Sequence, residues 1–154
     1  MHVELHNRYR ELPAAREAQD LIRACVHCGF CTATCPTYRL LGDELDSPRG
    51  RIYQIKQVLE GQVATDTTQR HLDRCLSCRS CETTCPSGVR YHKLLQSGKA
   101  VVEARVPRPL PQRLLRWGMR ALLPYPSRFR PIFRLGMLFR PLMPAVLRQK
   151  MPVV

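Results

Sequence analysis

The eight cysteines of this chain all fall into two short runs of identical form. Each run reads Cys-x2-Cys-x2-Cys-x3-Cys-Pro, and the cysteines are Cys25, Cys28, Cys31 and Cys35 in the first and Cys75, Cys78, Cys81 and Cys85 in the second. The four irons of a cubane cluster each need one thiolate, and a loop with this spacing wraps three of them. The two runs therefore predict a pair of [4Fe-4S] clusters.

The spacing leaves the fourth ligand of each cluster to come from elsewhere. In two-cluster arrangements of this type, the cysteine before the proline ligates the other cluster. This rule predicts that one cluster is held by Cys25, Cys28, Cys31 and Cys85. It predicts that the other is held by Cys75, Cys78, Cys81 and Cys35.

Two other uses of eight cysteines fit the sequence less well. Residues 1–12 mix charges of both signs and lack the apolar stretch of a secretory signal, so we expect a cytoplasmic chain with reduced thiols instead of disulfides. Structural zinc usually takes cysteines in pairs separated by a longer loop, whereas here a third cysteine follows at once. A zinc-stabilised interaction module remains the less favoured alternative.

The runs form an internal repeat with an offset of 50 residues, and the pattern around them is helical. Apolar residues at helical spacing predict a helix over 14–24, another precedes the second run at 69–74, and a third follows Ser47 and Pro48 and ends at Gly61. No alternation typical of strands is present. Residues 1–104 are predicted to form a mainly α module with little apolar core, so bound clusters are expected to contribute much of its folding.

From residue 105 onward the composition changes. Residues 105–154 hold eleven arginine and lysine residues, no acidic residue and nine of the thirteen prolines. This basic segment is predicted to contain two short amphipathic helices, 112–123 and 131–140, in which arginines such as Arg113, Arg116 and Arg120 lie opposite leucine and aromatic side chains. The predicted domains are thus 1–104 and 105–154.

A basic amphipathic segment has three interpretations. It fits docking on a partner subunit, peripheral binding to an anionic membrane surface, or attraction to nucleic acid. We favour partner docking, then the inner face of the cytoplasmic membrane, and nucleic acid last, because the arginines alternate with long apolar side chains. No apolar run approaches the ~20 residues that span a bilayer.

The stretches 21–61, 68–95 and 108–111 resemble the iron-sulfur subunit of bacterial glycolate oxidase. The resemblance implies an α-helical ferredoxin-like module that relays electrons from FAD-containing subunits toward the quinone pool, while those subunits oxidise glycolate to glyoxylate and often D-lactate to pyruvate. Iron-sulfur subunits of other membrane-linked dehydrogenases, for glycerol 3-phosphate or lactate, are the nearest alternatives. Members of the glycolate oxidase family continue into further cysteine-rich domains that these residues do not include, so we expect the chain to represent the N-terminal two-cluster part.

No residue of this chain is predicted to be catalytic. The sequence has no Rossmann fingerprint and no P-loop, and its glycines are isolated. His71 and His92 are interpreted as surface residues, as are His27, Arg79 and Arg90 near the cysteine loops. Substrate chemistry is therefore expected on another subunit.

Overall fold

The computed structural model describes residues 1–138, and the chain divides into two units, Met1–Pro107 and Arg108–Val154. The first unit contains α1 (Pro13–Ala24), α2 (Phe30–Ala33), α3 (Pro36–Leu41), α4 (Pro48–Leu59), α5 (Asp66–Asp73), α6 (Ser80–Thr83) and α7 (Tyr91–Glu103), with 3-10 turns η1 (Asn7–Tyr9) and η2 (Glu44–Asp46). The second contains α8 (Leu110–Leu122) and α9 (Pro126–Leu138). Over the described residues every regular element is a helix, which confirms the predicted mainly α class.

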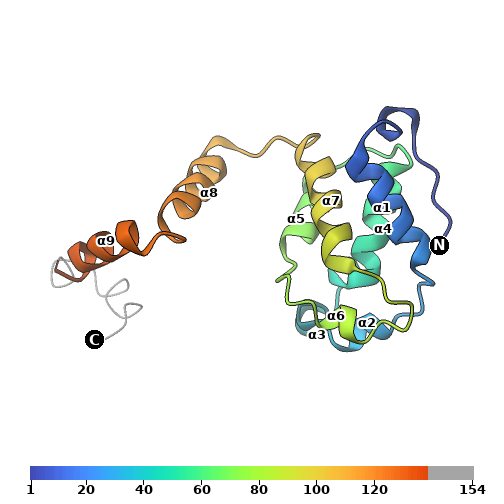
Figure 1. Ribbon diagram of the computed structural model, residues 1–154, viewed down its shortest axis with the longest axis horizontal. Coiled ribbons are helices and arrows are strands. Elements are labelled where there is room, and N and C mark those ends of the chain that lie inside the picture. The colour runs from blue at the N-terminus through green and yellow to red at the C-terminus, as the bar shows by residue number, and fades with distance from the viewer. Residues whose placement is uncertain (139–154) are drawn as a thin grey trace. The chain divides into compact units, whose positions relative to one another are not determined.

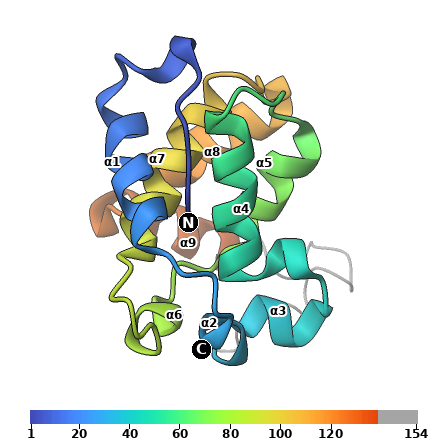
Figure 2. The same cartoon turned by 90° about the vertical axis from the view of Figure 1, so that its right-hand side faces the viewer.

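The first unit is a helical bundle with the cysteine loops at one end. Helix α7 packs against α1, α4 and α5, and the short helices α2 and α6 contact each other. Figure 1 shows the long helices α1, α4, α5 and α7 side by side, with α2, α3 and α6 together below them. The view in Figure 2 places the three short helices at the same end. Both cysteine runs therefore lie at one end of the bundle.

The apolar core fills the space between the long helices. It includes Ala15, Ala18, Leu21 and Ile22 of α1, Ile52, Ile55, Val58 and Leu59 of α4, Leu72 of α5, and Leu94, Leu95, Val101 and Val102 of α7. Val3 and Leu5 of the N-terminal segment join it, and the amide of His6 donates to the carbonyl of Leu59 at 2.9 Å. The expectation of little apolar core was wrong, because α7 and the N-terminal segment, which the sequence pattern did not reveal, bury further apolar side chains.

Helix α4 begins and ends where the sequence predicts. Ser47 caps it by accepting a hydrogen bond from the amide of Gly50 at 2.9 Å, and Pro48 occupies the first turn, where a missing N–H costs nothing. Gly61 follows the helix with φ of 109°, a backbone conformation that residues other than glycine rarely adopt. The cap fixes the position of Arg49 and Arg51, which both reach the cysteine loops.

Gly50→Ala is expected to destabilise the first unit. A Cβ at Gly50 would lie 1.9 Å from the carbonyl oxygen of Glu44, so the backbone of η2 would have to move. Overpacking of this kind costs about 1–3 kcal/mol, and a lower thermal unfolding midpoint by circular dichroism would report it. Gly118→Ala is the matched control, because a Cβ there meets no atom within 4 Å. An unchanged midpoint for Gly50→Ala would show that η2 adapts freely.

In the second unit, the first helix agrees closely with the prediction and the second does not. Helix α8 begins two residues before the predicted start at Gln112, but α9 begins at Pro126, five residues before the predicted start at Pro131. Pro131 lies inside α9. Phe139, Arg140, Arg148 and Lys150, which belonged to the predicted basic segment, lie outside the described residues.

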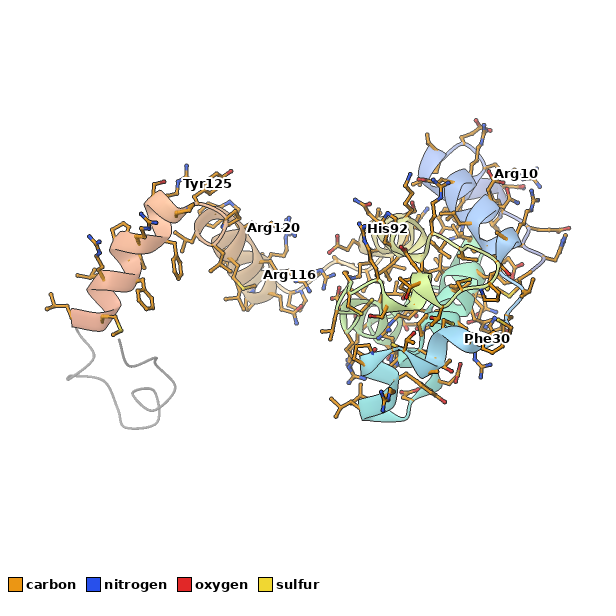
Figure 3. The ribbon with its side chains drawn as sticks, turned by 60° about the horizontal axis from the view of Figure 1, so that its bottom comes forward. Arg10, Phe30, His92, Arg116, Arg120 and Tyr125 are labelled. Carbon is orange, nitrogen blue, oxygen red and sulfur yellow. The ribbon has the colours of Figure 1, made fainter. Side chains whose placement is uncertain are left out.

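Both helices of the second unit are amphipathic, and neither buries a residue. Leu114, Leu115 and Trp117 of α8 are exposed, and Figure 3 shows Arg116 and Arg120 projecting from the same helix. The two helices touch, and the rings of Phe129 and Phe133 stack with centroids 5.7 Å apart. Among the described helices, none has the length and apolar character needed to cross a bilayer.

Candidate metal centre

The two cysteine loops repeat the same backbone path. Each begins at the end of a long helix, α1 or α5, and its third cysteine lies in a short helix, α2 or α6. His27 and Ser77, which are equivalent in the repeat, have φ of 59° and 54°. Gly29 and Arg79, also equivalent, have φ of 89° and 61°. Each loop thus takes two left-handed turns between its first and third cysteines.

Left-handed backbone is costly for residues with a side chain. His27, Ser77 and Arg79 each adopt it at a cost of roughly 1–2 kcal/mol. Strain of this kind persists where surrounding structure or a bound group compensates for it, and it gathers at functional sites. In the second loop, the turn aims the amide of Ser77 at the sulfur of Cys75, 3.4 Å away. The loops are therefore shaped to surround sulfur-rich groups.

The cysteines line two hollows. The first encloses about 430 Å³, partly open to solvent, and its cysteines are Cys25, Cys28, Cys31, Cys81 and Cys85. The second encloses about 400 Å³, and its cysteines are Cys35, Cys75, Cys78 and Cys81. The structure thus brings the last cysteine of each run beside the first three of the other run, and Cys81 borders both hollows.

The linings suit a soft, partly shielded metal cluster. Beside the thiols, the first hollow is lined by apolar groups such as Pro48, Ile52 and Val89. Cys25, Cys35 and Cys81 are buried, whereas Cys28 and Cys78 are exposed. Thiolate is the ligand that iron–sulfur clusters use, and each hollow is lined by at least the four cysteines that one cubane needs, with Cys81 common to both. The residues present therefore fit two [4Fe-4S] clusters.

Two of the thiols, those of Cys31 and Cys81, resist losing their protons in the absence of metal, because their pKa values are raised. Burial, reinforced by the neighbouring Cys31 and Cys75, raises the pKa of Cys81 to about 12. Burial likewise raises the pKa of Cys31. Cys78 differs, since hydrogen bonds from the hydroxyl and amide of Ser80 lower its pKa. Iron must therefore displace protons as it binds, which makes cluster assembly sensitive to pH.

The two loops also touch directly, through equivalent residues. The hydroxyl oxygens of Thr34 and Thr84 lie 3.0 Å apart, and both hydroxyls reach the carbonyl of Ser80 at 3.2 Å. The sequence repeat pointed to Thr34 and Thr84 as identical positions but not to this contact. It holds α2 against α6, and with them the third cysteine of each run.

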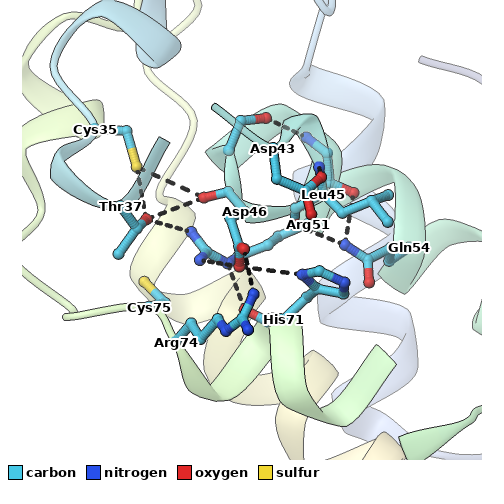
Figure 4. A network of polar contacts seen from close by, with 12 residues as sticks. Cys35, Thr37, Asp43, Leu45, Asp46, Arg51, Gln54, His71, Arg74 and Cys75 are labelled. Atoms are coloured by element: carbon cyan, nitrogen blue, oxygen red, sulfur yellow. Dashed lines mark hydrogen bonds and ion pairs between the residues drawn. The ribbon is translucent and has the colours of Figure 1, made fainter. Parts of the chain in front are cut away.

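A buried ionic network lies beside the second hollow (Figure 4). The carboxylate of Asp46 receives Arg51 Nη2 at 3.1 Å and Arg74 Nη1 at 2.8 Å, and His71 Nδ1 lies 3.1 Å from it. Asp46 and Arg51 are completely buried. Burial by itself raises the pKa of Asp46, but the contacts with His71 and Arg74 and the charge of Arg51 outweigh it and hold the pKa below its usual value. Asp46 is thus a carboxylate held among cations.

The network reaches the cysteines through hydroxyl groups. Arg51 Nη1 donates to Thr37 Oγ1 at 3.2 Å, and Thr37 Oγ1 lies 3.2 Å from the sulfur of Cys35. The hydroxyl of Tyr91, which is buried, faces the sulfur of Cys75 at 3.9 Å. The sequence predictions included none of these contacts.

The histidines near the loops correct one prediction and agree with another. His71 is buried in the ionic network, so its interpretation as a surface residue was wrong. His92 is only partly exposed, and its backbone amide and Nδ1 lie 2.6 Å and 2.7 Å from Oε1 of Glu82. His27, Arg79 and Arg90 are exposed, as predicted.

The fold and the paired hollows define a class of protein, a helical iron–sulfur module with two clusters. The family model described as "4Fe-4S dicluster domain" matches residues 21–89, which include both cysteine runs. Two [4Fe-4S] clusters are therefore its cofactors.

The resemblance to glycolate oxidase iron-sulfur subunits is confirmed across the chain. The chain is 60% identical over 152 residues to the "Glycolate oxidase iron-sulfur subunit" of Escherichia coli, covering 99% of this chain and 37% of that protein. It is 36% identical over 130 residues to the "Probable glycolate oxidase iron-sulfur subunit" of Bacillus subtilis, covering 82% of this chain and 28% of that protein. The chain thus spans well under half the length of these relatives.

A more distant similarity links the chain to an iron-sulfur subunit of a different enzyme. The "Succinate dehydrogenase iron-sulfur subunit" of Paracoccus denitrificans is 25% identical over 107 residues, which cover 64% of this chain and 40% of that protein. No solved structure matches the chain.

Proposed function

We propose that this chain is the electron-relay part of a glycolate oxidase complex. Electrons from glycolate oxidation on an FAD-containing subunit would enter one [4Fe-4S] cluster, pass to the other and leave toward the quinone pool. The observation that carries the proposal is the pair of adjacent cysteine hollows with a shared wall at Cys81 and Tyr91. The names of the relatives support glycolate as the substrate of the complex. We propose D-lactate as a second substrate.

We propose the crossed ligand sets for the two sites. The first site comprises Cys25, Cys28, Cys31 and Cys85, and the second site comprises Cys75, Cys78, Cys81 and Cys35. The lining of the hollows supports this assignment, because Cys85 borders the first and Cys35 the second. Crossing holds both clusters in one rigid end of the bundle, which suits transfer between them.

The chain's own residues contribute positioning, shielding and access. When bound, each cluster accepts and releases a single electron, which suits a flavin donor that must give up two. Pro48, Ile52 and Val89 exclude water from the first site. The exposed Cys28 and Cys78 mark where each site approaches the surface and a partner. No residue here is proposed to bind or transform glycolate.

The second unit is proposed to dock on a partner subunit of the same complex. Leu114, Leu115 and Trp117 of α8 offer an apolar face, and neighbouring arginines suit carboxylates at its rim. Peripheral binding at the inner face of the cytoplasmic membrane is the alternative use of the same helix. We propose the cytoplasm as the location of the relay in either case.

The test is anaerobic purification followed by metal analysis and reduction. We expect about eight irons and eight sulfides per chain and, after dithionite, an electron paramagnetic resonance spectrum broadened by two interacting clusters. With the flavin subunits present, glycolate should reduce the clusters, and D-lactate should do so as well. Zinc in place of iron, or no signal after reduction, would remove the relay.

A panel of substrates separates the nearest alternatives. Glycerol 3-phosphate and L-lactate serve as controls with the same flavin subunits. Cluster reduction by either of these, and none by glycolate, would assign the chain to a different dehydrogenase while leaving the relay intact.

A further inference from the structure

The two sites differ in ways that the sequence repeat makes easy to compare. Positions 50 residues apart are equivalent, so each side chain beside the second site has a counterpart in the other half of the repeat. If the two clusters had the same surroundings, an electron would have no preferred site. The surroundings are not the same.

Hydroxyl groups face the sulfurs of the second site. Thr37 Oγ1 lies 3.2 Å from the sulfur of Cys35, and the Tyr91 hydroxyl lies 3.9 Å from that of Cys75. The Thr37 hydroxyl also donates to the backbone carbonyl of Asp46 at 3.0 Å, so its one proton is shared between this oxygen and the sulfur of Cys35.

A third hydroxyl belongs to the second loop itself, since Ser80 follows Cys78 by two residues. The amide of Ser77 adds a donor to Cys75 at 3.4 Å. Cys35 and Cys75 therefore each face at least one donor, and Cys78 has the Ser80 hydroxyl two residues along the chain.

The first half of the repeat lacks these donors. The counterpart of Ser80 is Phe30, which has no hydroxyl, and the counterpart of Tyr91 is Leu41. Ser87, the counterpart of Thr37, borders the first hollow, but among the described residues no hydrogen bond joins its hydroxyl to a cysteine. Arg49, from outside the first loop, lines the first hollow beside Cys31.

The cations beside the two hollows differ in burial. Arg51 lines the second hollow and is completely buried, so water screens its charge little. It pairs with Asp46, which Arg74 also contacts and beside which the Asp43 carboxylate lies. Arg49, which lines the first hollow, is one-third exposed and pairs with Glu44.

We propose that the cluster of the second site, held by Cys75, Cys78, Cys81 and Cys35, has the higher reduction potential and is where electrons leave the module. Reduction adds one negative charge to a cluster, and donors to its sulfurs and nearby cations stabilise that charge. In the transfer step, the reduced first cluster loses one electron and the second gains it. The inference rests on the proposed relay and ligand sets, and it names Thr37, Ser80, Arg51 and Tyr91 as positioning residues that tune the second site.

The test is a reductive titration of the anaerobically purified chain, followed by electron paramagnetic resonance. The unmodified chain should be reduced in two one-electron steps, and the signal broadening from two reduced clusters should appear only in the second step. Tyr91→Phe, which removes the hydroxyl and keeps the ring, should move the first step to a more negative potential and leave the second in place. Thr37→Val and Ser80→Ala should shift the same step in the same direction.

Ser87→Ala is the matched control, since it removes the equivalent hydroxyl beside the first site. It should change neither step. A shift of the second step by Tyr91→Phe, Thr37→Val or Ser80→Ala, or no shift in any of the three, would overturn the inference. Three independent variants ensure that the result does not depend on the folding of one. Iron content and reduction by glycolate stay as separate measurements, so failure of the proposed function is distinguishable from failure of this assignment.

Discussion

When Cys25, Cys28 and Cys31 are all replaced by serine, only the cluster of the second site is expected to remain. The further change Cys35→Ser is then expected to remove the iron of that cluster. The further change Cys85→Ser should instead leave about four irons per chain. The reason is the position of the two cysteines, because Cys35 borders the second hollow and Cys85 the first. Iron and sulfide analysis of anaerobically purified protein measures the difference.

The reciprocal set of variants provides the control for this result. With Cys75, Cys78 and Cys81 replaced instead, Cys85→Ser should remove the iron and Cys35→Ser should spare it. The opposite dependence in both sets would mean that each run supplies all four ligands of its own cluster. Either set can be interpreted alone, so a variant that fails to assemble in one half does not prevent the test.

Asp46→Asn is expected to cause the largest loss of stability among changes outside the cysteines. The carboxylate and the guanidinium of Arg51 are both fully buried, and removing one partner of a buried pair leaves an uncompensated charge. Such changes cost about 3–5 kcal/mol. Urea unfolding of the cluster-loaded protein, followed without oxygen by circular dichroism and by cluster absorption, should show a much lower midpoint in both signals.

Two further variants show whether the loss comes from the buried charge. Adding Arg51→Met to Asp46→Asn should restore part of the stability, since no unpaired guanidinium remains to be buried. Glu11→Gln breaks the exposed pair with Arg16 and should change the midpoint little, because surface pairs contribute about 0–1 kcal/mol. If the loss of stability in the double variant equalled the sum of the losses in the two single variants, the buried ion pair would not be the origin of the effect.

The features that the sequence predicted best depend on short stretches of chain. The cysteine spacing predicted the cluster type, which the domain family confirms. Ser47 and Pro48 predicted the start of α4 because a cap needs only the residues next to it. The assignment of Cys35 and Cys85 to opposite clusters stays a prediction.

The buried ionic network was missed because its members belong to three separate elements of the chain. Asp46, Arg51 and His71 come from η2, α4 and α5, and nothing local in any of them reveals the others. One signal was available, since Arg51 lies on the same face as Ile55 and Val58 at helical spacing. A charged residue on an apolar face must find a partner, and this pattern called for a buried acid.

The start of α9 was misplaced for a different reason. Pro131 was taken as the first residue of a helix, but Pro126 already provides that start five residues earlier. A proline inside a helix removes one backbone hydrogen bond and is unfavourable. For this reason the sequence prediction placed Pro131 at the start of the helix and not inside it. Contact with α8 and the stacking of Phe129 on Phe133 accompany the longer helix.

The contact between Thr34 and Thr84 bears on how such a module can arise by gene duplication. The two hydroxyls belong to equivalent positions of the repeat and lie 3.0 Å apart. In a symmetric dimer, a residue on the twofold axis contacts the same residue of the other subunit. If the two subunits become one chain, this becomes a contact between two equivalent positions of the repeat. If the repeat arose from a half-length chain with a single cysteine run, this contact would have formed across a dimer interface, and fusion of the two copies would have made the pairing of the runs independent of protein concentration.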